Sequence, residues 1–261
     1  MIRAFRSEWL KIRRPAMMLG GAGAMIEFAV LAIVLTLNRL GSVGSGPGGV
    51  VVAAQVAASD GFATLMGVSA TFIGVVALAV CAVAVGMEYA NGTLRNLLVR
   101  QPARPRLLAG KLLALGSFLA LAVALAYGAA LATALILVPG HGISTAAWFT
   151  GAGVQSLLAT AGNLLLATLA WGAIGAGLAA VLRSTAVAIA GGLAYVLVVE
   201  NLLTATWSGG AQWLPGQLID AIAQGGTASV SYTSALGLVG LYLLVAGGIV
   251  GVLFQRRDVT A

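Results

Sequence analysis

Two carboxylates lie inside long apolar stretches of this sequence, where ionised side chains are costly. Glu27 lies in the run from Met17 to Leu37, and Glu200 lies in Val198-Val-Glu-Asn-Leu202. A charged group at the centre of a bilayer costs about 3 kcal/mol on insertion scales, so each carboxyl needs a proton, a partner or a function. Two interpretations stay open for each: a transport pathway in which it binds a cationic group or relays a proton, or a structural carboxyl satisfied by neighbouring helices.

Other kinds of chemistry are largely excluded by counting. Cys81 and His141 are each the only residue of their type, so one chain can form neither a disulfide nor a Cys-His zinc or catalytic site. No Walker phosphate-binding motif is present, because the nearest approach, Gly110-Lys111, has Pro105 where glycine is required. The pattern Gly175-Ala-Gly-Leu-Ala-Ala180 lies in an apolar stretch with no strand before it, which favours helix packing over dinucleotide binding. The sequence therefore predicts a protein that is not an enzyme and carries no cofactor of its own.

Six long apolar runs indicate an integral membrane protein. Each run is long enough to cross a hydrocarbon layer of about 30 Å as a helix. In the sequence, 60% of residues are hydrophobic and 8% are charged, whereas about 25% is usual for a soluble domain. Residues 1–261 are predicted to form a single all-α domain of six transmembrane helices, which span residues 17–37, 62–86, 112–138, 154–182, 185–206 and 233–254.

The basic residues orient these spans. Of the 14 Lys and Arg residues, all but Arg39 fall on one side of the alternating spans. By the positive-inside rule, that side and both termini are cytoplasmic. The net charge of +7 therefore indicates contact with anionic lipid headgroups and not with nucleic acid.

The first 15 residues are predicted to form an interfacial helix. Ile2, Phe5, Trp9 and Ile12 recur at helical spacing, and basic residues occupy the other face until Pro15 breaks the pattern. The alternative is a positively charged tail that serves only to set the topology.

The inner segment 88–111 contains a second short helix. Gly92 interrupts the preceding span, Thr93 can cap a new helix, and Pro102 ends it, which predicts about two turns over residues 94–99. The apolar ridge of this helix is Leu94, Leu97 and Leu98. A ridge this small cannot bury itself within a loop, so it is expected either in the membrane interface or in a groove of another protein.

These segments together resemble a known family. A start of the kind Ser7-Glu-Trp-Leu-Lys-Ile-Arg-Arg14 leads into six spans, Glu88-Tyr-Ala-Asn-Gly-Thr-Leu-Arg95 follows the second span, and an Arg/Pro-rich run closes on Lys111. The chain is similar to the membrane (permease) subunits of bacterial type-2 ABC (ATP-binding-cassette) transporters.

The resemblance implies partners and site residues. It makes the short helix a coupling helix that docks on a separate ABC ATPase, with two ATPase copies per complex binding ATP and Mg. It also implies a second permease subunit, identical or homologous, and a multi-pass position in the bacterial cell membrane. The expected ATPase-coupling residues are Glu88, Gly92, Thr93, Leu94, Arg95, Leu97 and Leu98. In the outer loop 207–231, residues 212–223 would form the re-entrant helical pair of such permeases.

The predicted function is the permease half of an ATP-driven exporter of hydrophobic or amphipathic compounds, such as a drug, antibiotic, peptide or lipid. Apolar spans with few polar groups favour such cargo over a strongly polar solute. The alternative is an ion- or proton-coupled secondary transporter that uses Glu27 and Glu200, although no Gly/Pro-broken helices occur at matching places in the two halves. The identity of the transported molecule is not encoded in any motif.

Overall fold

The computed structural model describes residues 2–13, 15–40, 51–90, 104–207 and 209–256, and these residues form helices and turns with no strand. Six helical stretches in this part of the chain are long and apolar enough to cross a membrane: Met18–Asn38, Gly61–Ala90, Leu108–Gly140, Gly151–Leu182, Thr185–Thr206 and Tyr232–Leu253. The prediction of a six-span, all-α membrane protein is confirmed.

The long helices are α3 (Gly23–Asn38), α5 (Gly61–Ala90), α7 (Arg104–Gly140), α8 (Gly151–Leu182) and α12 (Tyr232–Arg256). The first span begins with α2 (Pro15–Met17) and the π-helical turn η1 (Met18–Ala22), and the fifth consists of α9 (Thr185–Ala194), the π-helical turn η3 (Tyr195–Val199) and α10 (Glu200–Thr206). Such π-turns are found in α-helices mostly at functional sites or bends. Short elements fill the connections: α4 (Ala53–Ala57), η2 (Ala146–Phe149), η4 (Gly210–Gln212) and α11 (Pro215–Ala223).

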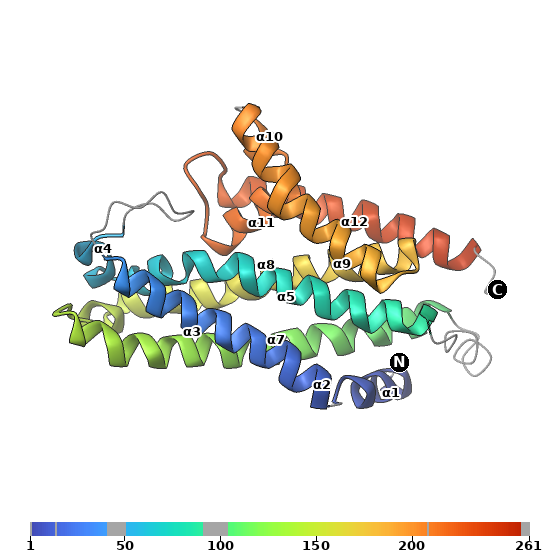
Figure 1. Ribbon diagram of the computed structural model, residues 1–261, viewed down its shortest axis with the longest axis horizontal. Helices are drawn as coiled ribbons and strands as arrows, with labels where there is room; N and C mark the ends of the chain where they lie inside the picture. The colour runs from blue at the N-terminus through green and yellow to red at the C-terminus, as the bar shows by residue number, and fades with distance from the viewer. Residues whose placement is uncertain (1, 14, 41–50, 91–103, 208, 257–261) are drawn as a thin grey trace.

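The centre of the bundle is the pair α5 and α8, which α3 and α7 flank (Figure 1). Small residues let these two helices approach closely, as is usual where lipid supplies no hydrophobic drive for association. A Cβ on Gly175 would overlap the backbone of Leu78, and one on Gly74 would overlap the ring of Trp171. Gly175 therefore serves helix packing, as its place in an apolar run predicts.

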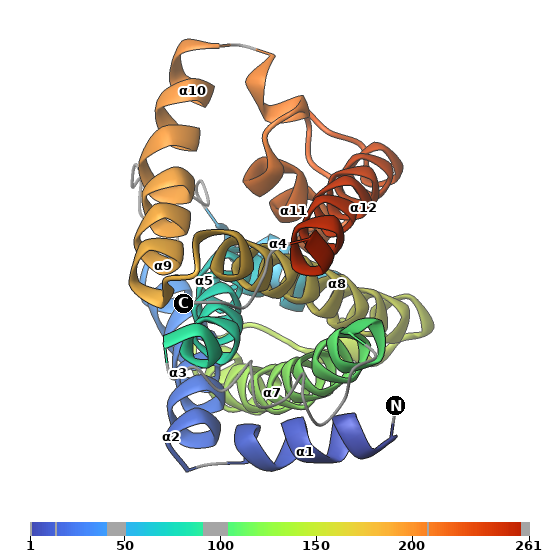
Figure 2. The same cartoon turned by 90° about the vertical axis from the view of Figure 1, so that its right-hand side faces the viewer.

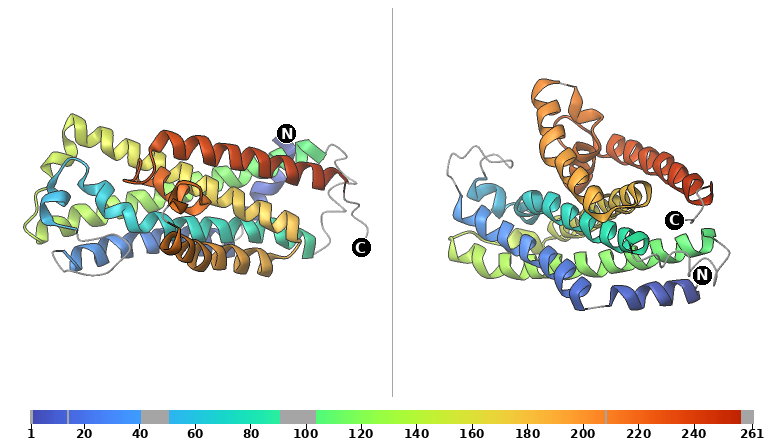
Figure 3. Two further views of the ribbon diagram at one scale, coloured as in Figure 1. Left: turned by 90° about the horizontal axis from the view of Figure 1, so that it is seen from above. Right: turned by 45° about the vertical axis from the view of Figure 1, so that its right-hand side comes forward.

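Helix α1 (Ile2–Ile12) lies across one end of the bundle. Figure 2 looks along the length of the bundle and shows α1 extended beneath α7, which it contacts. The last turns of α12 lie at the same end (Figures 1 and 3). The N-terminal helix and the end of the sixth span therefore lie at the same end of the bundle, as expected for an even number of spans.

The later helices form a second group beside the first. In Figure 3, α10 rises away from the central bundle, and α11 lies between it and α8. Helix α11 packs against α8, α12 and α5, and its apolar side chains are buried, with Leu218 at 0% exposed. A hydrogen bond of 3.1 Å from the Thr71 hydroxyl to Asp220 Oδ1 ties α11 to α5.

Candidate functional site

Four charged side chains form a closed cluster at the end of the bundle that carries α1. Lys11 Nζ lies 2.6 Å from Glu8 Oε1 and 2.8 Å from Glu88 Oε1. Lys111 Nζ lies 2.8 Å from Glu8 Oε2 and 2.7 Å from Glu88 Oε1. Each lysine thus bridges both carboxylates, and the four charges sum to zero. We call Glu8, Lys11, Glu88 and Lys111 the inner ion-pair cluster.

The cluster joins three helices around the segment between α5 and α7. Glu8 and Lys11 belong to α1, Glu88 lies in the last turn of α5, and Lys111 lies in the first turns of α7. Glu8, Glu88 and Lys111 are buried at 3%, 6% and 7% exposed, so water screens the two ion pairs of Lys111 little, whereas the side chain of Lys11 is 39% exposed and its pairs are more accessible to water. Removing one partner from a buried pair leaves an uncompensated charge. The free-energy cost of that charge opposes separation of the helices that the cluster connects.

The electrostatics of α1 reflect this balance. Burial disfavours the charged form of Glu8, but the attraction of Lys111 and hydrogen bonds from both lysines outweigh it, so the pKa of Glu8 is lowered. Burial likewise disfavours the charged form of Lys11, but its hydrogen bonds to Glu8 and Glu88 outweigh it, and the pKa of Lys11 is raised. Both groups are therefore charged near neutral pH.

Docking of α1 is expected to weaken in acid. Because the pKa of Glu8 in the folded chain lies below its ordinary 4.5, the stability it contributes is complete above pH 4.5 and is lost as the pH falls through the folded value. The contribution of Lys11 is complete below pH 10.5 and is lost as the pH rises through its raised value. Amide hydrogen exchange of Ile2–Ile12, corrected for intrinsic rates, should show protection at pH 7 that falls below pH 4.5. A Glu8→Gln chain should lack this acid step, and an identical acid step in both chains would contradict the assignment.

Two further contacts fix the end of α5. The guanidinium of Arg183, at the turn between α8 and α9, lies 6.0 Å from the ring centre of Tyr89, within reach of a cation–π interaction. A Cβ on Gly86 would overlap the side chain of Thr185, so α5 and α9 are in close contact there. The end of α5 is thus held by α1, α7 and the α8–α9 turn together.

Most of the predicted ATPase-coupling residues fall outside the described residues: Gly92, Thr93, Leu94, Arg95, Leu97 and Leu98. Glu88 is described, and its carboxylate points into the inner ion-pair cluster, where it contacts Lys11 and Lys111. Its position is at the base of the predicted coupling segment.

The sequence reasoning did not single out three members of the cluster, Glu8, Lys11 and Lys111, as site residues. One local signal was available, since Glu8 and Lys11 are three residues apart and share a helix face. The other three pairs join residues 23, 77 and 103 positions apart, and no spacing rule reveals them.

Glu200 is buried, at 1% exposed, and faces the start of α11. Its Oε1 accepts a hydrogen bond of 2.8 Å from the backbone N–H of Gly216, in the first turn of that helix. The first N–H groups of a helix lack partners within the helix and carry partial positive charge, so they suit a carboxylate. The buried carboxyl of Glu200 is therefore hydrogen-bonded to the backbone of Gly216, sixteen residues further along the chain.

The fit between Glu200 and Gly216 leaves no room for a side chain. A Cβ on Gly216 would overlap the carboxylate of Glu200. We expect Gly216→Ala to push α11 off Glu200 and to cost about 1–3 kcal/mol, the usual penalty for overpacking a buried site. Thermal unfolding of the purified chain measures this cost. Gly237→Ala in α12 is the matched control, because nothing lies within 4 Å of the added Cβ, and an equal loss in both variants would contradict the capping role.

Glu27 is placed differently from Glu200. Its side chain is exposed on α3, about the middle of the first span. No hydrogen bond or ion pair to Glu27 is found within the described part of the chain. The structure therefore does not bring Glu27 and Glu200 together into one site. The described residues also contain no group of three His, Cys, Asp or Glu that could hold a metal ion.

Comparison with known proteins gives the family. The model of the family described as ABC-2 family transporter protein matches residues 4–201, which include most of α1, the first four spans and most of the fifth. A search of curated proteins finds no match. The match covers well over half of the chain. This chain belongs to the ABC-2 family of transporter proteins and is a multi-pass membrane component of an ABC transporter.

Proposed function

We propose that this chain is the permease half of an ATP-driven exporter of hydrophobic or amphipathic compounds. A separate ABC ATPase, two copies per complex, supplies the energy and binds ATP and Mg. Two permease subunits, identical or homologous, enclose the pathway in the bacterial cell membrane, with both termini in the cytoplasm. The observation that carries this proposal is the inner ion-pair cluster, because it lies at both ends of the segment expected to meet the ATPase.

The cluster suits the transmission of force. Helix α5 ends at Ala90, and α7 begins at Arg104. The ion pair of 2.7 Å between Glu88 and Lys111 joins these two helices. A displacement of the intervening segment by an ATPase would therefore move α1, α5 and α7 as one unit. We assign Glu88 to the base of this unit, where it positions the coupling segment, and leave direct ATPase contact to Gly92, Thr93, Leu94, Arg95, Leu97 and Leu98.

The two intramembrane carboxylates take different roles in this proposal. An exposed Glu27 facing lipid at mid-depth would be costly, which favours a position toward the second permease subunit and the pathway between them. Glu200 caps α11. A secondary transporter driven by protons would then lack the second of its two expected carboxylates.

The test is co-purification followed by transport. The tagged full chain, solubilised from its native membrane, should bring down an ATPase with a Walker motif, and the reconstituted complex should move an amphiphilic dye across vesicles only with hydrolysable ATP. A chain that stays intact and folded but brings down no ATPase, with dye movement that follows a proton gradient instead, would refute the proposal.

A further inference from the structure

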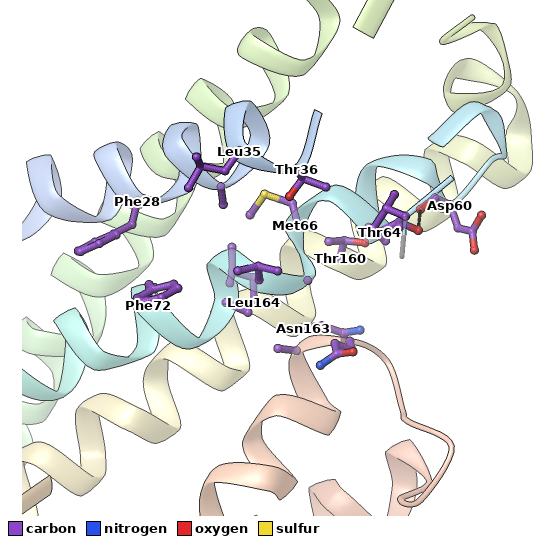
Figure 4. A pocket seen from close by; sticks show the side chains of 18 of the residues that line it. Phe28, Leu35, Thr36, Asp60, Thr64, Met66, Phe72, Thr160, Asn163 and Leu164 are labelled. Atoms are coloured by element: carbon purple, nitrogen blue, oxygen red, sulfur yellow. Dashed lines mark hydrogen bonds between the residues drawn. The ribbon is translucent and has the colours of Figure 1, made fainter. Parts of the chain in front are cut away.

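A cavity of about 640 Å³ lies in the half of the bundle away from α1, which is the outer half in the proposed topology. It lies between α3, α5, α8 and the end of α11 (Figure 4). Pockets that bind drug-sized molecules have volumes of about 300–1,000 Å³. The lining follows α3 from Phe28 and ends at Arg39, the residue just after this helix, so the cavity extends about 16 Å along the bundle at about 1.5 Å for each of the eleven steps. It therefore reaches from the outer surface to about the middle of the membrane.

The inner end of the cavity is apolar and aromatic. The rings of Phe28 and Phe72 are stacked with their centres 5.3 Å apart, and Leu35 and Met66 continue the apolar lining from there toward Thr36 (Figure 4). Phe72 is 44% exposed and Leu35 is 43% exposed, so the cavity is open at the surface of the bundle along these side chains. A hydrocarbon chain that lies against them gains dispersion contacts.

The outer end is polar and carries both signs of charge. Arg39 and Asp60 line the cavity there, and Thr36 and Asn163 lie nearby. The Tyr232 hydroxyl donates a hydrogen bond of 2.7 Å to Asn163 Oδ1, which fixes the amide and directs its NH₂ group away from Tyr232. Arg39 and Asp60 give the outer end one charge of each sign, so a head group with both an anion and a cation is attracted to both, whereas a singly charged head group is repelled by one of them.

We propose that this cavity binds a single-chain amphiphile with a zwitterionic head group, whose hydrocarbon chain lies against the stacked rings of Phe28 and Phe72 and whose head group lies between Arg39 and Asp60. The polarity of the lining changes along the bundle in the same direction as the polarity of a leaflet, so such a molecule keeps its ordinary depth when it enters. All of the lining residues named here belong to one subunit. This inference rests on the proposed function. It adds the chemical class of the molecule that the permease holds before release.

Gly67 provides a way to fill the cavity without distorting the helix. It lines the cavity, and nothing lies within 4 Å of a Cβ added to it. Gly128 in α7 is equally unobstructed, lies on the exposed side of its helix and does not line the cavity. Gly67→Leu and Gly128→Leu therefore form a matched pair, in which the same side chain is added inside and outside the site.

The experiment uses the full chain, with any subunits that co-purify, in nanodiscs without ATP. The probe is a lysophosphatidylcholine that carries a diazirine at the end of its acyl chain. After illumination, the labelled peptides should be those that contain Phe28 and Phe72. Gly67→Leu should lower this labelling at least about tenfold, because leucine takes the place of three or four methylene-sized groups of the probe, while Gly128→Leu should leave it within about twofold of the wild-type level.

A second variant tests the head group without changing the volume. Asp60→Asn should lower labelling by the zwitterionic probe several-fold and raise labelling by a fatty acid with the same diazirine, since the anionic head group then no longer meets a carboxylate. Even labelling of all lipid-facing helices, or labelling that both Gly67→Leu and Asp60→Asn leave unchanged, would overturn the proposal.

Two readouts identify the source of the ligand and separate this inference from the proposed function. A zwitterionic lipid retained by the wild-type chain in native mass spectrometry, and lost in Gly67→Leu, identifies a resident membrane lipid. Loss of bound probe on ATP addition to the complex identifies cargo. Because binding is measured without ATP, the two proposals can fail separately. Labelling at Phe28 and Phe72 in a chain that recruits no ATPase would uphold the binding site and refute the exporter. Recruitment of an ATPase without this labelling would uphold the exporter and refute the binding site.

Discussion

A Lys111→Met chain is expected to lose about 3 kcal/mol or more of stability and with it ATP-driven transport. Lys111 is 7% exposed and contacts Glu8 and Glu88 at 2.8 and 2.7 Å. Methionine keeps most of the volume but leaves two buried carboxylates with Lys11 as their common partner. The expected result is a lower unfolding temperature of the purified chain and weaker hydrogen-exchange protection of α1.

Two variants separate the ion pair from a general effect of substitution. The double variant Glu8→Gln with Lys111→Met removes one charge of each sign and keeps the contact between Lys11 and Glu88, so it should recover a substantial part of the loss. Arg6→Gln changes an exposed charge on the same helix and should shift stability by less than about 0.5 kcal/mol. If Lys111→Met were no less stable than Arg6→Gln, the inner ion-pair cluster would not be what holds α1, α5 and α7 together.

Replacing the apolar ridge of the coupling segment should abolish capture of the ATPase. In Leu94→Asp with Leu98→Asp, two carboxylates replace side chains that we expect in a groove of the partner, and about 3 kcal/mol of lost affinity is more than a hundredfold. The measurement is the ratio of ATPase to tagged chain after purification from the membrane.

The matched control is Leu94→Met with Leu98→Met, which keeps an apolar surface of similar volume and should retain the ATPase. Both double variants should remain inserted in the membrane, since neither residue lies in one of the six spans. Recovery of a full complement of ATPase with the aspartate variant would exclude this ridge as the contact.

The length and polarity of the apolar runs were enough to predict the membrane helices. The fifth span, residues 185–206, is the same in the sequence prediction and in the structure, because Ser184 begins a helix there by accepting a hydrogen bond from the N–H of Val187. The second span is longer than predicted. It continues from residue 86 to Ala90, since Glu88 at its end is buried by partners from α1 and α7 and does not remain in water.

The pairing of polar groups could not be predicted in the same way. The sequence identifies Glu200 as a carboxyl that needs a partner, but the partner is a backbone N–H on α11, and a backbone group has no sequence signature. Glu8 is an ordinary acidic residue in a basic segment until the fold brings Lys111 within 2.8 Å of it. Spacing along a helix predicts contacts between near neighbours only, so a cluster that joins three helices becomes visible when the helices are packed.

The location of the coupling segment can be measured directly with a single cysteine. Cys81 is the only native cysteine and is buried, so Cys81→Ala provides a background in which Thr93→Cys reports on the segment and Asn38→Cys, exposed at the other end of the first span, reports on the outer side. In intact cells, a membrane-impermeant maleimide should label Asn38→Cys but not Thr93→Cys. After permeabilisation it should label Thr93→Cys, and bound ATPase should slow that reaction. Labelling of Thr93→Cys in intact cells would place the segment outside and contradict coupling to a cytoplasmic ATPase.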